Sequence, residues 1–357
     1  MFDLEAYVAA ALAACGARVS ASEAFDLAAK EMIQIHGGVG FTWEFDIHFL
    51  LKRGKLQGRT LTSLTITDLA APRHADVVDH PLVKIDTGDL LKRIDGLFEK
   101  DYDAVFHLSS AVSGECEADF DLGLRSNLDA TRRMLDAMRA QHARTNQAAL
   151  FFFASSVAVF GSDPAIPLGA VVRDGTLPTP QSSYGIHKFI CEQLIADYTR
   201  KGFIDGRVAR LMTVSVRPGK PNGAASSFLS GIVREPLAGV ASVCPVELST
   251  AVALSSPETT IAGILAVAEA TREAFGGRTA LNLPALTVTV GQMLEALEKV
   301  AGKDVANLVT VKPDPTIAKI VGGWPSKFDC ERTHRFGLQP DTSYQAVIEQ
   351  YIRMQKG

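Results

Sequence analysis

The chain has 357 residues, of which 47% are hydrophobic and 21% charged, and its formal net charge is -4. This length supports a substantial core without staples, and it predicts two domains or one large α/β domain with an appendage. The lack of a basic surplus excludes nucleic acid as an expected partner. The start of the chain has neither a basic leader nor an apolar run of membrane-spanning length, so no membrane association is expected. Its five cysteines are scattered without metal-type spacing, which indicates free thiols in a cytoplasmic protein and no metal site.

The first sixty residues differ in sequence pattern from the rest of the chain. Residues 5–14 and 23–35 are alanine-rich helical patterns, and a glycine-rich run and a further helical stretch at residues 44–52 follow. Two outcomes are open for the middle of this region. Residues 32–35 form the first strand of a sheet, or residues 23–35 stay helical and the sheet lacks its central strand. We favour the first outcome, because omitting a central strand leaves backbone polar groups of both neighbours unpaired.

From about residue 60, apolar strand-like runs alternate with helical patterns. Strands are expected at residues 61–67, 82–85, 104–108, 148–154 and 207–216, and helices at residues 90–98, 118–140 and 183–200. This alternation predicts an α/β fold, a Rossmann-type doubly wound parallel sheet with helices on both faces. After Arg217 the elements become shorter and include helices near residues 226–237 and 289–300. They indicate a smaller C-terminal lobe over the carboxyl ends of the strands, where open α/β sheets bind ligands.

The run SSYGIHK places Tyr184 and Lys188 four residues apart at the start of an expected helix, so that both lie on one face. A phenol with an ordinary pKa of about 10 is a poor base near neutrality, and a neighbouring ammonium favours its ionised form. Ser156, at the end of the fourth expected strand, can orient a substrate oxygen. An isolated Tyr-x-x-x-Lys pair arises often by chance, but the strand ending in Ser-Ser and the proline-containing loop before it make this combination rarer.

These residues resemble the extended short-chain dehydrogenase/reductase family, also called the NAD-dependent epimerase/dehydratase family. The likeness covers about residues 57–357, and the runs TPQSSYGIHK and VSVRPGKPNGAASSFLSGIVREPLAG are similar in particular to D-erythronate-oxidising members. The resemblance implies oxidation of a short sugar acid at its 2-hydroxyl with NAD. It makes Tyr184 the base, Lys188 its activator and a ribose ligand, and Ser156 the orienting hydroxyl. It also implies that Asn127 supports Lys188 through water.

On the cofactor side, Asp68 follows an expected strand, where a carboxylate can accept from the ribose hydroxyls and would repel a 2′-phosphate, which favours NAD over NADP. By resemblance, Asp89 and Leu90 contact adenine, and the turn that contains Ser109 lets the backbone approach the cofactor. The domains expected are an atypical helical segment at residues 1–30, an NAD-binding Rossmann domain at 31–216 and a substrate-binding lobe at 217–357. A homodimer is possible, as in other family members.

The expected phosphate loop is atypical. Gly37 and Gly40 occupy the first two glycine positions, but Trp43 stands at the third, where close packing needs a glycine. Moreover, residues 9–53 resemble the C-terminal end of acyl-CoA dehydrogenases, flavoproteins whose matching segment contributes to a FAD site. No other part of the chain resembles that family. The chain therefore reads as a chimera, and we expect Trp43 to weaken pyrophosphate binding.

A sugar acid needs a cation and short polar groups. Arg234, on an expected amphipathic helix, is the candidate for its carboxylate, and a surface arginine is the even alternative. Ser113, Asn222 and Ser227 are candidates for its hydroxyls. Arg217 is expected to brace a loop or the cofactor rather than touch substrate. Two other functions stay open: a sugar-nucleotide epimerase or dehydratase on the same scaffold, and a chimeric Rossmann protein with impaired cofactor binding and no activity.

Overall fold

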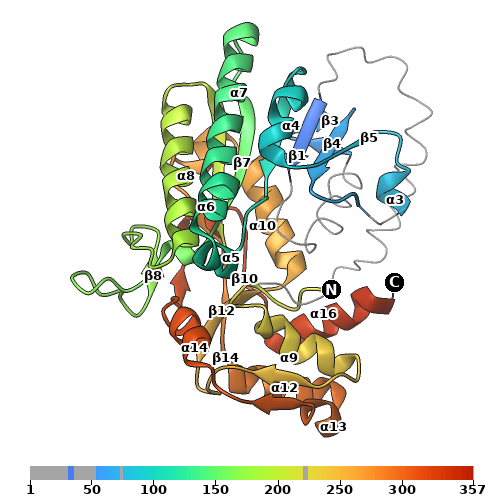
Figure 1. The fold of residues 1–357 in the computed structure, drawn as a ribbon, viewed down its shortest axis with the longest axis vertical. Helices are drawn as coiled ribbons and strands as arrows, with labels where there is room; N and C mark the ends of the chain where they lie inside the picture. Colours follow the sequence, from blue (N-terminus) through green and yellow to red (C-terminus); the bar gives the residue numbers. More distant parts are fainter. Residues whose placement is uncertain (1–30, 36–53, 73–74, 220–223, 357) are drawn as a thin grey trace.

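A computed structural model describes residues 31–35, 54–72, 75–219 and 224–356. Seven parallel strands form its central sheet in the order β13-β9-β7-β6-β1-β4-β5 (Figure 1). The strands are β1 (Glu31–Ile35), β4 (Leu64–Asp68), β5 (Val83–Thr87), β6 (Tyr102–His107), β7 (Ala149–Ser156), β9 (Ile204–Leu211) and β13 (Leu281–Asn282). The Rossmann-type sheet expected from the sequence is confirmed.

Strand β1 lies in the middle of this sheet. It pairs in parallel with β4, Met32 opposite Leu64, and with β6, Ile33 opposite Val105. The outcome in which the helix continued to residue 35 is therefore wrong for residues 31–35, because strand pairing satisfies the backbone groups of both neighbours. The expected phosphate loop at Gly37 and Gly40, Trp43 and the helix at residues 44–52 lie outside the described residues.

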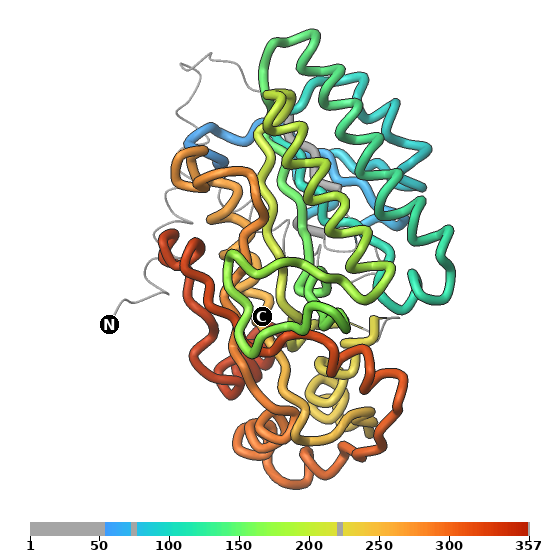
Figure 2. The backbone as a smooth tube through the Cα atoms, turned by 90° about the vertical axis from the view of Figure 1, so that its left-hand side faces the viewer, coloured from blue at the N-terminus to red at the C-terminus, as the bar shows by residue number. Residues whose placement is uncertain are grey.

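Helices cover both faces of the sheet (Figures 1 and 2). Three of them, α4 (Leu90–Leu97), α7 (Ala130–Thr145) and α8 (Ser183–Arg200), pack on one face, and α10 (Pro257–Glu269) packs on the other. Strand β7 lies between these two helix layers, which explains why residues 149–154 are all apolar. Phe151 and Phe153 point into the layer with α7 and α8, whereas Phe152 points into the layer with α10, as successive strand residues must.

A smaller lobe has its own apolar core, in the lower part of Figure 1. Its main elements are β10 (Thr213–Val214), α9 (Phe228–Leu237), β12 (Ala251–Ser255), β14 (Leu286–Thr289), α12 (Val290–Ala301) and α16 (Tyr344–Lys356). The remaining short elements are β2 (Lys55–Leu56), β3 (Arg59–Thr60), α3 (Ala75–Val78), α5 (Ser113–Ala118), α6 (Phe120–Gly123), β8 (Val172–Arg173), β11 (Ser242–Cys244), α11 (Arg272–Phe275), α13 (Lys303–Ala306), β15 (Val309–Val311), α14 (Pro315–Gly322), β16 (Phe328–Asp329) and α15 (Glu331–His334).

The two parts of the fold are interleaved along the chain. After entering the small lobe at β10, the chain returns to the sheet layer to form α10 and β13, and Leu281 of β13 pairs with Ala209 of β9. The small lobe resumes at β14. The chain first leaves the large sheet after Leu211 of β9, a few residues before the expected division at residue 217, while α10 and β13 belong spatially to the large sheet.

One expected helix is interrupted. In place of a single helix over residues 118–140, α6 is followed by η1 (Leu124–Asp129), a π-helical segment that leads into α7. Wider turns of this kind are frequent at functional sites, since they redirect side chains that a regular helix would turn away. Asn127 lies within η1 and is buried.

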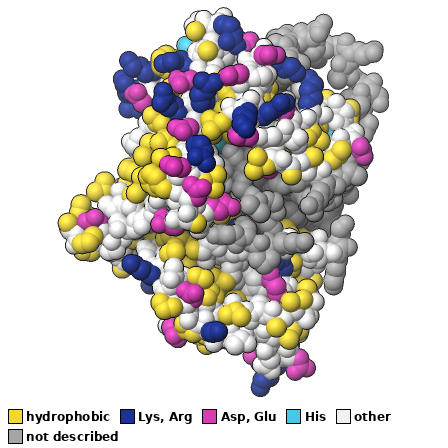
Figure 3. Space-filling view, viewed as in Figure 1, with side chains coloured by type: hydrophobic (Ala, Val, Ile, Leu, Met, Phe, Trp, Pro, Cys, Tyr) yellow, Lys and Arg dark blue, Asp and Glu magenta, His cyan; other side chains and the backbone are white. Residues whose placement is uncertain are grey.

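Charged side chains of both signs are mixed over α4 and α7 (Figure 3). Two of the ion pairs on these helices are Arg133 with Asp95 at 2.7 Å and Arg144 with Asp101 at 2.8 Å. This face therefore has no strong potential of one sign. Within the described residues, no helix combines the length and apolar character needed to cross a bilayer.

Candidate active site

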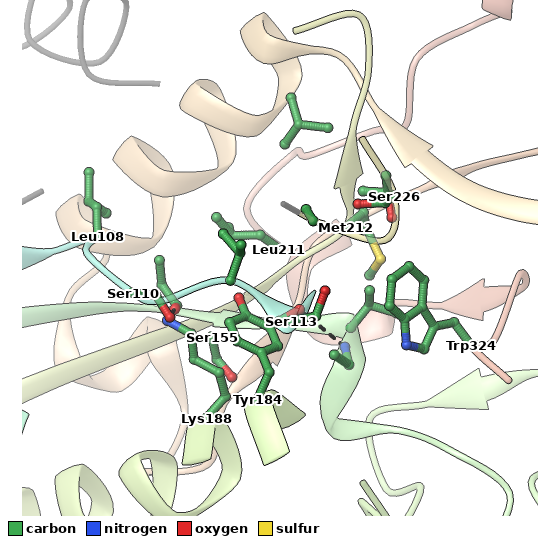
Figure 4. A pocket seen from close by; sticks show the side chains of 18 of the residues that line it. Leu108, Ser110, Ser113, Ser155, Tyr184, Lys188, Leu211, Met212, Ser226 and Trp324 are labelled. Carbon is green, nitrogen blue, oxygen red and sulfur yellow. Dashed lines mark hydrogen bonds between the residues drawn. The ribbon is translucent and has the colours of Figure 1, made fainter. Parts of the chain in front are cut away.

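The two residues of the Tyr-x-x-x-Lys pair project from the first turns of α8 into one cavity (Figure 4). Ser182 caps this helix, and its hydroxyl accepts from the backbone N–H of Gly185 at 3.2 Å. The cavity measures about 200 Å³ and is also lined by Ser156. It lies where β7 and β9 end, at the carboxyl edge of the sheet, so the three residues expected to carry the chemistry are brought together.

Gly185 permits this approach. A Cβ atom on Gly185 would lie 2.1 Å from the carbonyl oxygen of Ala158, in the 3-10 turn η2 (Val157–Val159) that follows Ser156. Any other residue would push the first turn of α8 away from β7. Glycine between Tyr184 and Lys188 thus sets the distance between the helix and the serine-bearing strand end.

Burial dominates the titration of both ionisable residues on α8. It raises the pKa of Tyr184 to about 12, against the opposing effects of hydrogen bonds with Ser156 and Ser110 and of the charge of Arg217. It lowers the pKa of Lys188 to about 8. The Lys188 ammonium donates to the carbonyl oxygen of Ala154 at 2.8 Å. Desolvation thus opposes the expected lowering of the phenol pKa toward neutrality and outweighs the charge of Arg217.

Asn127 anchors the loop after β6. Its Oδ1 accepts from the backbone N–H of Ala111 at 2.7 Å and from the Ser110 hydroxyl at 3.1 Å, and its Nδ2 donates to the Ala111 carbonyl at 3.1 Å. Its side chain thus reaches Tyr184 through Ser110. The water-mediated support of Lys188 implied by the family stays a prediction.

The expected adenosine-side residues lie at the carboxyl edge of the sheet beside β1. The backbone carbonyl of Asp68, at the end of β4, accepts from the N–H of Gly88 at 2.8 Å, which ties the turn after β4 to the turn after β5. Asp89 caps α4 by accepting from the N–H of Leu91 at 3.1 Å, and Leu90 is the first residue of that helix. Burial raises the pKa of the Asp68 carboxyl.

Ser109 turns its side chain into the protein. Its hydroxyl lies 3.2 Å from Nδ1 of the buried His107, whose Nε2 lies 2.9 Å from the Thr131 hydroxyl. Burial, and then the charge of Lys188, hold the pKa of His107 well below its usual range. These contacts hold the His107 ring inside the protein. Because the Ser109 side chain points inward, a cofactor on the outer side of this turn would meet the backbone of residue 109.

The residues present fit a nicotinamide dinucleotide. A carboxylate follows β4, where ribose hydroxyls need acceptors, and helix α4 starts beside it at Leu90. The hydroxyl-bearing residues of the cavity lie further along the same edge of the sheet, where β6 and β7 end. In the described part of the chain, no cluster of three or more His, Cys, Asp or Glu side chains could hold a metal ion.

The predicted substrate residues fall into different places. Ser113 is buried, lines the cavity and accepts from the N–H of Ala225 at 3.4 Å. Asn222 lies outside the described residues. Ser226 lines the cavity, whereas Ser227 does not.

Arg234 does not line the cavity either. It is buried, and its guanidinium donates to the Arg217 carbonyl at 2.9 Å and pairs with Glu235 at 2.6 Å. These donors are directed at the Arg217 carbonyl and at Glu235 rather than into the cavity, so its expected role on the substrate carboxylate stays a prediction that these contacts do not favour. Arg217 itself lines the cavity.

Sequence reasoning did not predict several residues that line the cavity, among them Ser110, Ser155, Thr213, Ser226 and Trp324. Ser110 had a signal, because it follows Ser109 in a turn where the family has small apolar residues. Trp324 had none, since it follows α14 in the small lobe and reaches the cavity only through the packing of that lobe (Figure 4).

A parallel sheet with a carboxylate after β4, and a Ser–Tyr–Lys set at the end of β7 and the start of α8, defines a Rossmann-fold dehydrogenase that uses a nicotinamide dinucleotide. The model of the "NAD dependent epimerase/dehydratase family" matches residues 33–250. The chain is 45% identical over 326 residues, 90% of its length and 97% of the relative, to a D-erythronate dehydrogenase of Cupriavidus necator. It is 42% identical to one of Haemophilus influenzae, covering 72% of this chain and 80% of the relative.

Among solved structures, the nucleoside-diphosphate-sugar epimerase from Agrobacterium tumefaciens superposes with a TM-score of 0.84 at 36% identity, covering 94% of this chain and 97% of that one. The chain therefore belongs to the NAD dependent epimerase/dehydratase family and is an enzyme of the NAD-dependent oxidoreductase class. The short flavoprotein likeness is also found. Fifty residues, 14% of this chain, are 48% identical to the acyl-CoA dehydrogenase IpdE2 of Mycobacterium tuberculosis, of which they cover 16%.

Proposed function

We propose that the protein oxidises a short sugar acid of the D-erythronate kind at its 2-hydroxyl to the 2-oxo acid, with NAD rather than NADP. One observation carries this proposal: Tyr184, Lys188 and Ser156 line a single cavity of about 200 Å³. The curated relatives named D-erythronate dehydrogenase support the substrate class.

In this proposal Tyr184 is the base. The substrate hydroxyl gives its proton to the Tyr184 oxygen, C2 loses its hydrogen with the electron pair, and a C=O bond forms. Bound NAD supplies the acceptor for that hydride. Ser156 holds the substrate oxygen, and Lys188 and Arg217 supply positive charge that favours the phenolate. Lys188 is the candidate for the ribose hydroxyls, and Asp68 for those on the adenosine side.

A sugar-nucleotide substrate is the second candidate, because a solved relative carries the name of a nucleoside-diphosphate-sugar epimerase. The likeness to known proteins supports the sugar acid, because the identity is 45% to the D-erythronate dehydrogenase of Cupriavidus necator and 36% to the epimerase.

The test is a fluorescence titration of the purified protein with NADH, with NADPH and FAD as controls, followed by D-erythronate oxidation monitored as NADH formation. Saturable binding of NADH in preference to NADPH, and turnover of the acid, are expected. Absence of any nicotinamide binding would contradict the proposal and would point to the N-terminal segment as a failed phosphate site. NADH binding with turnover of a nucleotide-sugar alone would instead favour the second candidate.

A further inference from the structure

The charged groups that line the cavity are unusually one-sided. Of its lining residues in the described part of the chain, Lys188 and Arg217 carry positive charge and none is an aspartate or glutamate. Hydroxyl groups make up much of the remaining polar wall: Ser110, Ser113, Ser155, Ser156, Tyr184, Thr213 and Ser226. Such a wall suits an anion that also carries several hydroxyls.

The two cations are placed differently. The Lys188 ammonium is held against β7, 2.8 Å from the carbonyl of Ala154 and 4.6 Å from the ring centroid of Phe153. It therefore serves the strand end and the cofactor side. Arg217 comes from the loop that follows β10, at the entrance to the small lobe, and lines the same cavity.

The backbone of Arg217 is clamped on both sides by α9. Its N–H donates to the Ser230 hydroxyl at 3.0 Å, and its carbonyl accepts from Arg234 at 2.9 Å. The backbone position from which this side chain enters the cavity is therefore fixed, so less conformational entropy is lost when the residue binds a ligand. Arg234, itself neutralised by Glu235, thereby supports the position of Arg217 rather than competing for the substrate.

The surroundings of Arg217 favour an anion beside it. Burial and the nearby charge of Arg234 lower the pKa of Arg217 to about 10, because both disfavour its charged form. A carboxylate bound there would relieve both effects and could engage the guanidinium through two parallel hydrogen bonds.

We infer that Arg217 binds the carboxylate of the substrate and is the residue that selects a sugar acid over a neutral polyol or amide. This inference rests on the proposed function and adds the determinant of specificity to it. It places the carboxylate at the small-lobe side of the cavity and the reacting hydroxyl at Tyr184, so a carboxylate one carbon away from that hydroxyl fits the short span of the cavity.

The test compares D-erythronate with D-erythronamide, which keeps the hydroxyls but lacks the charge. Wild-type enzyme is expected to prefer the acid, with kcat/KM higher by about 10- to 100-fold, the range of a charged hydrogen bond. Arg217→Met should remove that preference, mainly through KM for the acid, and Arg217→Lys should restore part of it. NADH affinity should stay unchanged in both. Arg144→Met, on the exposed end of α7, is the matched control and should keep the wild-type ratio.

Three results separate the ideas. Turnover of the acid with the same acid-to-amide ratio in wild type and Arg217→Met, at normal NADH affinity, would overturn the role of Arg217 and leave the proposed function standing. A wild-type enzyme that does not discriminate acid from amide would overturn it without any variant, even if Arg217→Met does not fold. Failure of the wild type to oxidise either compound would overturn the proposed function and, with it, the inference.

Discussion

The carboxylate of Glu192 is bound by the guanidinium of Arg210 through two hydrogen bonds of 2.9 and 2.7 Å, and both side chains are buried. Glu192 lies one helical turn beyond Lys188 on α8, and Arg210 lies on β9. The same carboxylate accepts from the Ser155 hydroxyl at 2.5 Å. This ion pair therefore joins α8, β9 and the end of β7 directly behind the cavity.

Breaking one side of this pair should be more harmful than removing both. Arg210→Met leaves the Glu192 carboxylate buried without its counter-ion, and we expect it to lower the free energy of unfolding by about 3–5 kcal/mol. The double variant Glu192→Leu/Arg210→Met should recover a large part of that loss. Urea unfolding of the wild type, both single variants and the double variant gives the coupling energy. Additive single and double effects would show that the two residues act independently.

Tyr184→Phe should lower kcat for the acid by about 10²- to 10⁴-fold, because it removes the proton acceptor. The ring and its packing are retained, so NADH affinity and the thermal unfolding midpoint should stay close to wild type. Steady-state kinetics and an NADH titration measure the two effects separately. A kcat within a factor of two of wild type would remove Tyr184 from the mechanism.

Asp68→Ala tests the adenosine side of the site. Loss of the carboxylate removes an acceptor for the ribose hydroxyls and the charge that repels a 2′-phosphate. The Kd for NADH should rise by about 10-fold, and the ratio of NADPH to NADH affinity should move toward one. Asp95→Ala, at an exposed position of α4 outside the expected cofactor site, serves as the comparison and should leave both affinities unchanged. A parent protein that already prefers NADPH would contradict the role given to Asp68.

Gly185→Ala should harm both stability and catalysis. The added methyl would overlap the Ala158 carbonyl at 2.1 Å, so α8 must shift and Tyr184 with it, at a cost of about 1–3 kcal/mol. Gly96→Ala is the matched control. Gly96 lies in helix α4 with no atom within 4 Å of the new methyl, and the change should stabilise by about 0.5–1 kcal/mol. Thermal unfolding and kcat of the two variants are compared, and equal behaviour would argue against tight packing at residue 185.

The depressed pKa of Lys188 predicts a specific pH dependence. Between pH 8, near its folded pKa, and its ordinary value of about 10.4, the unfolded chain binds a proton that the folded chain lacks, so stability rises with pH. Lys188→Met removes this contribution. The free energy of unfolding of wild type relative to Lys188→Met should increase by about 3 kcal/mol from pH 7 to pH 10.5. A difference that is constant over this range would contradict the burial of a charged lysine.

Local signals predicted much of the fold. The helix expected at residues 183–200 is α8, Ser183–Arg200. A serine cap marks its start, and a long segment with helical periodicity predicts its length. The requirement for a central strand correctly placed β1 in a stretch with helical propensity, since sheet pairing outweighs a weak local preference. In contrast, the two-residue strand β13 has no local signal, because only its pairing with β9 defines it.

The site shows the same division. Tyr184, Lys188 and Ser156 could be identified because they lie at the end of one expected strand and the start of the next expected helix. The cavity brings all three together. That Arg217 rather than Arg234 lines the cavity could not be predicted from the sequence. Both flank the same small lobe, and which guanidinium meets the cavity depends on how α9 packs against the loop after β10, a tertiary relation without a local pattern.

The late return of the chain to the sheet has a consequence for biosynthesis. By the time residue 217 has been made, every residue assigned here to catalysis is present, yet β9 is still an open sheet edge and the face under α10 is bare. Both are covered only when residues 257–282 have been synthesised. Until then, the nascent protein presents an unpaired strand and apolar surface to its surroundings, the two features that favour aggregation. A shortened gene product ending near residue 217 would stay in that state. The last third of the chain therefore protects the sheet formed by the first two thirds from aggregation.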